Sequence, residues 1–414
     1  MIRFIHTADI HFGMENYGRI DPKTGIHSRL LDFERALNAI IDIAIDQSVD
    51  FFLFSGDAYK TAHPSPTQQK LLVRCLLRLY QGKIPVVIVV GNHDNPLSFG
   101  KAHSLDIFQG LPFDGFYVIA KPTLIKLNTK NGPINIVGIP WPTRNTISLS
   151  DQHIESSASQ ITEYISRGVA HIIADFAQKI DPTIPAVLAG HLTVSSGVFS
   201  GSEKRAIYGT DPILLPSQLA LAPFDYVALG HLHRYQNLNP EGYPAIVYSG
   251  SIERIDFGER KEEKGFCLVS IHEKGKTEHE FIKTPTRPFI QVDVTLDKSC
   301  DHTEQIMDAI SKYSIEDAVI KIVYHVPVGC KDMVDIKIVQ RKCTNAWYIA
   351  GIIPVRAIDT RQRRQALPID MDMAGLLGTY FLSKPELKDR NTHLVEMALA
   401  ILNEVQSQEE EMGS

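Results

Sequence analysis

Seven residues of metal-ligand type stand at or just beyond the ends of short apolar runs in this 414-residue chain. They are Asp9, His11, Asp57, Asn92, His191, His231 and His233. Carboxylate, imidazole and amide oxygen suit Mn²⁺, Fe²⁺ or Zn²⁺, and the absence of thiolates from the set argues against a structural zinc site. Two carboxylates, four imidazoles and one amide are too many ligands for one ion and suit two. We therefore predict a two-metal centre with Asp57 as the bridging ligand, because a carboxylate has two oxygens to share.

A centre of this kind favours one type of reaction. Two divalent ions ~3.5–4 Å apart can activate a water and clamp a phosphoryl oxygen for in-line displacement. The ligand set therefore predicts phosphoester hydrolysis.

The apolar runs that precede the ligands read as buried strands. They span 2–8, 51–54, 86–90, 186–189 and 226–229, and a glycine stands directly before the ligand after the last four. Glycine allows a sharp exit from a strand, and ligands of open α/β sheets bind beyond the carboxyl ends of the strands. We expect five strands to bring N and O ligands to one rim. Because residues i and i+2 of an extended strand share a side, Asp9 with His11, and His231 with His233, are each expected to hold one ion together.

Helical patterns separate these strands. The segment 29–45 has apolar residues at helical spacing, and Ser65-Pro66-Thr67-Gln68 is typical of a helix start. The helix that follows carries a wide apolar stripe from Leu71 to Leu79. That stripe fits either a well-covered core helix or a dimer contact, and both readings stay open. Turn signals at 239–242 and 273–275 indicate hairpins farther along.

The chain is too long for one core and suggests two or three domains. We predict an α/β layered domain over 1–284, an α+β domain over 285–359 and a helical segment over 360–414. A net charge of −6 gives no strong global field for DNA or an anionic membrane. Five separated cysteines without a C-x-x-C pair, no signal peptide and no apolar stretch near ~20 residues predict a cytoplasmic protein with no membrane association.

Single pieces of the pattern, such as Asp-x-His or Gly-Asp, are weak signals. The ordered series Asp9-x-His11, Gly56-Asp57, Gly91-Asn92-His93-Asp94, Gly190-His191 and Gly230-His231-Leu232-His233 resembles the calcineurin-like metallophosphoesterase superfamily. Within it, Gly56-Asp57-Ala58-Tyr59, His191-Leu192-Thr193-Val194 and Ser249-Gly250-Ser251-Ile252-Glu253-Arg254 resemble the SbcD-type DNA nuclease subunits. The resemblance covers roughly the first 270 residues.

The resemblance implies a four-layer α/β/β/α metallophosphoesterase sandwich with a small α+β DNA-capping domain and C-terminal helices that dock a partner. One metal would be held by Asp9, His11, Asp57 and His233, and the other by Asp57, Asn92, His191 and His231. His93 would protonate the leaving oxygen or stabilise transition-state charge, with Asp94 orienting it. The alternative for His93 is a turn residue bonded to backbone. Some relatives have His where Lys60 stands, and neither Lys60 nor the nearby His63 is assigned a role.

The leading hypothesis is a nuclease with two Mn²⁺, or Mg²⁺ or another divalent ion. It would act as a 3′-to-5′ exonuclease on duplex DNA and an endonuclease on single strands or hairpins. The resemblance implies a homodimer within a heterotetramer with an SbcC-type coiled-coil ATPase. The first alternative is hydrolysis of small phosphodiesters, nucleotides or phosphoproteins, which would use the same ligands. The second is a non-enzymatic scaffold, which would typically have lost ligands, whereas none is missing here.

Overall fold

The computed structural model describes residues 1–96, 102–110, 114–144, 157–201, 211–298, 301–356, 372–384 and 386–412, with side chains to 402 in the last helix. Contacts group Met1–Val355 into one compact unit and Arg356–Ser414 into another. The predicted boundary at 359/360 falls outside the described residues, as does Cys300, and the predicted boundary at 284/285 stays a prediction.

The first sheet has six strands in the order β14-β13-β1-β2-β3-β4. Their bounds are β1 (Ile2–Thr7), β2 (Phe51–Phe54), β3 (Val86–Val89), β4 (Phe116–Ile119), β13 (Gly265–Glu273) and β14 (Lys276–Lys283). Strands β1 to β4 run parallel, and β13 is antiparallel to both of its neighbours. Every residue of β2 and β3 is buried, as expected for parallel strands covered on both faces.

The second sheet also has six strands, in the order β11-β12-β10-β7-β6-β5. Their bounds are β5 (Thr123–Thr129), β6 (Gly132–Ile139), β7 (Ala186–His191), β10 (Tyr226–Gly230), β11 (Gln236–Asn237) and β12 (Ala245–Tyr248). Its four central strands run parallel. Two short strands, β8 (Thr193–Val194) and β9 (Ile213–Leu214), pair beside it. The hairpins predicted at 239–242 and 273–275 are confirmed, since they join β11 to β12 and β13 to β14.

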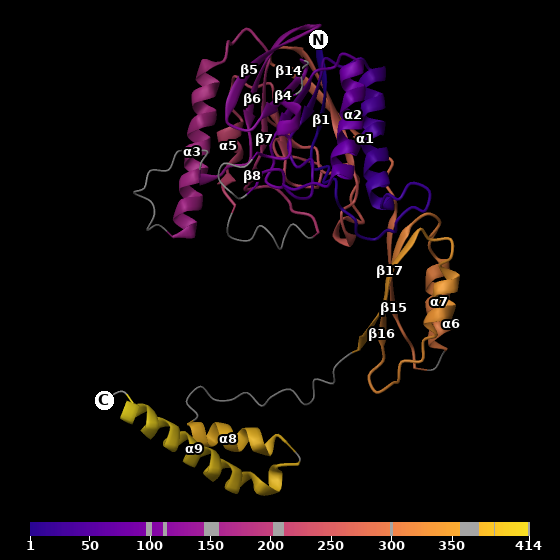
Figure 1. The fold of residues 1–414 in the computed structure, drawn as a ribbon, viewed down its shortest axis with the longest axis vertical. Helices are drawn as coiled ribbons and strands as arrows, with labels where there is room; N and C mark the ends of the chain where they lie inside the picture. The colour runs from indigo at the N-terminus through magenta and orange to yellow at the C-terminus, as the bar shows by residue number, and fades with distance from the viewer. Residues whose placement is uncertain are drawn as a thin grey trace. The chain divides into compact units, whose positions relative to one another are not determined.

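The sheets stack face to face between two helical layers (Figure 1). Helices α1 (Ser28–Asp46) and α2 (Pro66–Gln81) cover the outer face of the first sheet. Helices α3 (Ala158–Lys179) and α5 (Pro216–Leu219) cover the second. Side chains from both sheets, Phe4 and Tyr226 among them, fill the space between. The predicted α/β/β/α sandwich is confirmed.

Helix α2 begins as its sequence predicts. Ser65 accepts a hydrogen bond from the Gln68 amide, and the Gln68 side chain accepts one from the Ser65 amide at 2.9 Å. The apolar stripe is buried against α1 and the first sheet through Leu71, Leu72, Cys75, Leu76 and Leu79. Of the two readings of this stripe, the core helix is the one that the structure supports. The predicted homodimer therefore draws no support from α2.

A smaller sheet follows in the same unit, in the order β15-β16-β17. It comprises β15 (Phe289–Thr295), β16 (Val319–Val326) and β17 (Tyr348–Arg356), with helices α6 (His302–Ser311) and α7 (Ile336–Lys342). Val292, Ile306 and Ile322 belong to its own apolar core. We refer to residues 289–355 as the cap.

The segment before the cap looks like a linker in sequence but is packed in the structure. Arg287 is 4% exposed and donates from Nη2 to Asp32 Oδ1 at 2.7 Å and from Nη1 to Asp317 Oδ1 at 2.6 Å. Its guanidinium also lies 4.2 Å from the ring centroid of Trp347. We call Asp32, Arg287, Asp317 and Trp347 the joint, because they tie α1 of the sandwich to the cap.

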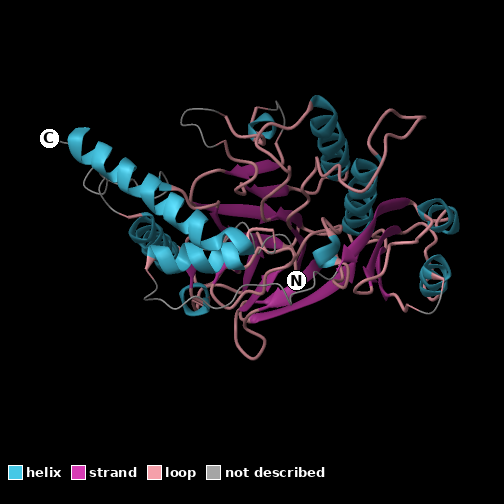
Figure 2. Cartoon of the chain, turned by 90° about the horizontal axis from the view of Figure 1, so that it is seen from below, coloured by secondary structure: helices cyan, strands magenta, loops and turns pink. Residues whose placement is uncertain are grey.

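The second unit consists of α8 (Met373–Leu382), a short 3₁₀ turn η6 (Lys388–Arg390) and α9 (Asn391–Met412). The two helices lie side by side (Figure 2). No residue of α8 is buried. Large apolar side chains are exposed on both helices at Met373, Tyr380, Leu382, Met397 and Ile401. Over the described parts of the chain, the helices are all too short or too polar to cross a membrane.

Candidate metal centre

The predicted ligands meet at one rim that both sheets share. Asp9 and His11 follow β1, Asp57 follows β2, and Asn92 follows β3 of the first sheet. His191 ends β7, and His231 and His233 follow β10 of the second. The predicted meeting of five strand ends therefore occurs, although the strands come from two stacked sheets.

One half of the centre gathers Asp9, His11 and His233, whose ligand atoms lie within 4.8 Å of one another. His11 Nε2 lies 3.0 Å from His233 Nε2. Both oxygens of Asp9 accept a hydrogen bond from the His231 amide at 3.1 Å. This bond ties the end of β1 to the end of β10.

The other half gathers Asn92, His191 and His231. Asn92 Oδ1 lies 2.9 Å from His191 Nε2 and 3.2 Å from His231 Nδ1. Between the halves, Asp57 Oδ2 lies 3.4 Å from His191 Nε2 and 3.7 Å from His11 Nε2. Asp57 thus occupies the position that a bridging ligand requires.

The backbone at the rim is not extended. Asp9, His11, Asp57 and His231 all have positive φ, at 53°, 51°, 61° and 102°. The expectation that His231 and His233 would hold one ion together as i, i+2 neighbours of a strand is therefore wrong. The turn at His231 sends its ring toward Asn92, while His233 faces His11.

Two of the glycines before the ligands are required by close approach. A Cβ at Gly91 would lie 2.1 Å from Asp57 Oδ1, and a Cβ at Gly230 would lie 2.1 Å from the Ser55 carbonyl oxygen. Any larger residue at either position would push these strand ends apart.

Asp94 was predicted to orient His93, but its hydrogen bonds in the structure go to backbone amides. It is fully buried and accepts hydrogen bonds from the amides of Asp57, Ala58 and Tyr59 at 2.9–3.1 Å, and from the Gly91 amide at 3.1 Å. The carboxylate therefore ties the loop after β2 to the loop after β3. It shapes the backbone that presents Asp57.

His93 lies at the mouth of the centre. Its side chain is 45% exposed, whereas the side chains of the candidate ligands His11, His191, His231 and His233 are at most 10% exposed. Its Nδ1 lies 2.7 Å from the Lys60 carbonyl oxygen, and its Nε2 lies 4.0 Å from Asp57 Oδ2. The ring is thus bonded to backbone, as the alternative reading has it, and also faces the centre.

The outward nitrogens of His191 and His233 each have a hydrogen-bond acceptor, which places the proton on that nitrogen. His191 Nδ1 lies 2.8 Å from the Ser55 carbonyl oxygen, and His233 Nδ1 lies 2.8 Å from Glu259 Oε1. His231 differs, because its Nε2 faces Asp211 Oδ2 at 3.3 Å. When these rings are neutral, the nitrogen opposite the protonated one carries a bare lone pair. In His191 and His233 that nitrogen is Nε2, which faces Asn92 Oδ1 and His11 Nε2 respectively. Such convergence of lone pairs suits cations, so the residues present fit two divalent ions.

Burial and charge set the ionisation of the cluster. Burial lowers the pKa of His191, but the Asp57 carboxylate outweighs it and raises that pKa to about 9. Burial lowers the pKa of His11 well below its usual value, despite Asp57. The pKa of Asp57 lies below its ordinary value, because His191 and His11 outweigh the effect of burial. The charges of Asp57 and His191 thus stabilise each other.

Sequence reasoning missed Glu259 and Asp211, which stand behind ligand rings. Glu259 ends the 3₁₀ turn η4 (Phe257–Glu259) and carries no strand-end signal. Burial raises its pKa, but the Lys264 ammonium and the hydrogen bond from His233 outweigh burial and bring it to about 2. Trp141 was missed as well, and its ring lies 4.7 Å from the ring of His231.

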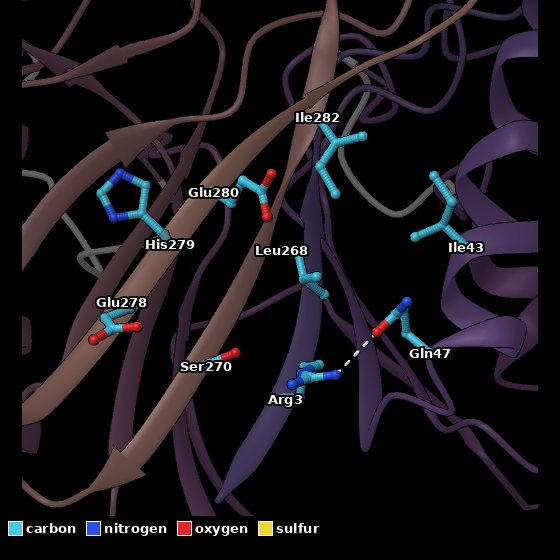
Figure 3. A pocket seen from close by; sticks show the side chains of 9 residues that line it. All are labelled: Arg3, Ile43, Gln47, Leu268, Ser270, Glu278, His279, Glu280 and Ile282. Carbon is cyan, nitrogen blue, oxygen red and sulfur yellow. Dashed lines mark hydrogen bonds between the residues drawn. The ribbon is translucent and has the colours of Figure 1, made fainter.

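A surface groove lies away from the centre. It runs between α1 and strands β13 and β14, and its lining includes Arg3, Gln47, Leu268 and Glu280 (Figure 3). Arg3 stands at the start of β1, whereas the ligands follow its end, and no predicted ligand lines the groove.

Comparison with known proteins identifies the family of this chain. The model of the calcineurin-like phosphoesterase family matches residues 2–235, a stretch that contains all seven predicted ligands. A dimetal phosphatase from Danio rerio aligns with 9% identity and a TM-score of 0.39, covering 68% of this chain and 98% of that one. TT1561 of Thermus thermophilus aligns with 12% identity and a TM-score of 0.37, over the same shares.

Proposed function

This chain belongs to the calcineurin-like phosphoesterase family, and we propose that it is a manganese-dependent DNA nuclease. It would digest duplex ends 3′ to 5′ and cut single strands or hairpins. Metal-dependent hydrolysis of phosphoesters is the chemistry of the family, and the clustered Asp and His ligands suit it. The proposal goes beyond this family chemistry in two points, which are manganese as the metal and DNA as the substrate.

One observation carries the choice of a polymeric substrate. The rim is open at His93, and the cap contacts the turn η4 that carries Glu259. Lys321 of β16 lies 5.6 Å over the ring of Phe257, in the same turn as Glu259, which contacts the ligand His233. A small phosphodiester needs no second domain beside the centre, whereas a DNA strand extends beyond its scissile bond. Cations such as Lys321 attract backbone phosphates.

The side chains have distinct roles in this proposal. Two bound divalent ions would supply Lewis-acid activation of a water and of the phosphoryl oxygen. Asp57 would hold both ions, and Asn92 would hold one of them together with His191 and His231. Because the Lys60 carbonyl binds the proton on His93 Nδ1, the second proton of the imidazolium sits on Nε2, the nitrogen nearer the centre. That proton can pass to the leaving oxygen.

The test is a substrate comparison. The full chain in Mn²⁺ is incubated with 3′-labelled duplex DNA, a hairpin, bis-p-nitrophenyl phosphate and a phosphopeptide, with EDTA as control. We expect loss of the duplex label in Mn²⁺ and none in EDTA. Activity confined to the small substrates would contradict the nuclease and favour the alternative phosphoesterase. Inactivity on every substrate, with intact Mn²⁺ binding, would favour a scaffold.

We also propose that α8 and α9 dock an SbcC-type coiled-coil ATPase, in an assembly with a homodimer of this chain. The support is the apolar surface that these helices leave exposed, including Tyr380 and Ile401. Co-expression with such an ATPase should yield a complex with two copies of each chain by light scattering. Tyr380→Asp with Ile401→Asp should abolish the complex, while Lys388→Asp, on the same unit, should keep it. Equal binding by both variants would refute this docking surface.

A further inference from the structure

We propose that Glu259 is a positioning residue of the metal centre. It would act through His233, holding the ring so that the Nε2 lone pair faces the ligand cluster, and Lys264 would hold Glu259 in place. The inference rests on the metal chemistry of the proposed function and not on its DNA substrate. Glu259 is fully buried, so its effect on substrate can only be indirect.

The contact between Glu259 and His233 fixes one form of the ring. Glu259 Oε1 lies 2.8 Å from His233 Nδ1, and an ionised carboxylate can only accept there. The Nδ1 position must therefore carry the proton. On the far side, Nε2 lies 3.0 Å from His11 Nε2, within the cluster. Without the carboxylate, the ring would be free to rotate about its side-chain bonds or to place its proton on the nitrogen that should bind a metal.

Glu259 is itself held from two directions. Its second oxygen, Oε2, accepts from the Ile255 amide at 2.9 Å and lies 2.9 Å from Lys264 Nζ. Lys264 is buried as well and donates to the His233 carbonyl oxygen at 2.9 Å. One lysine thus binds both the backbone of a ligand histidine and the carboxylate behind its ring. Burying such an ion pair is costly in desolvation, so hydrophobic packing alone would not favour it.

The other rings have weaker supports. His191 and His93 bond to backbone carbonyl oxygens, and His231 faces Asp211 at 3.3 Å. Asp211 has 13% of its side chain exposed, whereas the side chain of Glu259 is fully buried. A buried carboxylate raises the basicity of a ligand imidazole more than a carbonyl does, and loss of such a partner costs about 10–100-fold in metal affinity. Of the supports of His93, His191, His231 and His233, that of His233 by Glu259 is therefore the one with the largest expected effect.

The turn that carries Glu259 is held by a hydrogen bond and by ring contacts. Asp256 accepts from the Gly258 amide at 2.7 Å, and the centroid of the Phe257 ring lies 5.3 Å from that of Tyr17 and 5.1 Å from that of Phe289. These contacts hold the backbone from which the Glu259 side chain extends.

The test compares two carboxylates that share Lys264. Glu259→Gln keeps the size of the side chain and removes its charge. Glu262→Gln is the matched control, because Glu262 Oε2 lies 3.1 Å from the same Lys264 Nζ and no contact between Glu262 and His233 is found in the described chain. Mn²⁺ affinity is measured by titration calorimetry on the full metal-free chain, with no DNA present, and thermal midpoints are measured in chelator.

We expect Glu259→Gln to bind one of two Mn²⁺ about 10–100-fold more weakly, with the other site unchanged. Glu262→Gln should stay within about twofold of the parent, and excess Mn²⁺ should restore turnover to Glu259→Gln. Parent-like affinity of Glu259→Gln, or an equal loss in both variants, would overturn the proposal. The two proposals can fail separately. If the parent binds Mn²⁺ but does not cut DNA, the nuclease proposal fails and the role of Glu259 can still be measured. If Glu259→Gln binds Mn²⁺ like the parent, the role of Glu259 fails whether or not the chain cuts DNA.

A measurement on the parent protein keeps the inference testable if Glu259→Gln does not fold. Nitrogen-15 NMR of the metal-free chain reports which imidazole nitrogen of His233 carries hydrogen. We expect protonated Nδ1 and bare Nε2. A proton on Nε2 with Nδ1 bare would overturn the proposal.

Discussion

At the residue scale, the metal centre depends on backbone that most side chains avoid. Four of the predicted ligands have positive φ, and non-glycine residues in such regions cost on the order of 1–3 kcal/mol each. The four amides bound by Asp94 and the bond from the His231 amide to Asp9 hold this backbone in place. Hydrogen bonds within the chain therefore support the backbone of the candidate ligands.

Gly91 tests how tightly the strand ends must approach. In Gly91→Ala, the new Cβ would collide with Asp57 Oδ1 at 2.1 Å, so we expect a loss of about 1–3 kcal/mol of stability and much weaker Mn²⁺ binding. Thermal unfolding and calorimetry measure the two effects. Gly110→Ala is the control, because its nearest atom is 3.9 Å away. Parent-like Mn²⁺ binding by Gly91→Ala would show that Asp57 tolerates displacement.

His93 tests the proton transfer. We expect His93→Gln to cut the rate of phosphodiester cleavage by roughly 10²–10⁴-fold, the usual contribution of general acid catalysis, with Mn²⁺ affinity retained. Cleavage rates and calorimetry separate the two quantities. His63→Gln, an exposed histidine nearby in sequence, should behave like the parent. If cleavage by His93→Gln persists unchanged, its acid role is wrong.

At the element scale, α2 shows how one stripe of leucines supports two readings until its neighbours are known. Its five stripe residues pack against α1 and the first sheet. Ion pairs such as Arg74 with Glu34 link the same two helices at the surface. The helix therefore packs beside β3, the strand that precedes Asn92.

We expect the double substitution Leu72→Asp and Leu76→Asp to unfold the chain, since burying unpaired carboxylates costs several kcal/mol. Far-UV circular dichroism and solubility provide the measurement. Lys70→Asp, an exposed position on the same helix, should remain folded. Soluble, folded monomers of the double variant would instead support a dimer contact at α2.

At the scale of the whole molecule, the joint connects the cap to helix α1 of the sandwich. Asp32 of α1 accepts hydrogen bonds from Arg29 and Arg287, and Arg19 and Arg287 both lie over the ring of Trp347. A segment with the sequence of a linker thus forms a buried contact.

Arg287→Met should cost roughly 3–5 kcal/mol of unfolding free energy, with the lower end expected because Arg29 still pairs with Asp32. Arg35→Met is the matched control. Arg35 pairs with the same carboxylate at 3.1 Å, but its side chain is 48% exposed, so about 0–1 kcal/mol should be lost. Urea denaturation measures the unfolding free energy of both variants. Equal losses of unfolding free energy would mean that burial of the joint does not contribute to stability.

The sequence by itself determined the candidate ligand set, its order along the chain and the strands that carry it. These features are local: an apolar run, a glycine and a ligand, or Ser65 and Gln68 at the start of α2. The family comparison agrees over residues 2–235. The layered fold follows from the same alternation of strand and helix.

Only the tertiary structure decided which atoms of the candidate ligands face one another, what Asp94 binds and which groups stand behind the histidines. His11 and His233 are 222 positions apart, and Asp57 and Asp94 are 37 apart. Hydrophobic periodicity specifies which face of an element is buried, but it does not specify which polar atoms meet across two sheets. Positive φ at His231 and the ion pair of Glu259 with Lys264 arise from such meetings, so no local pattern could predict them.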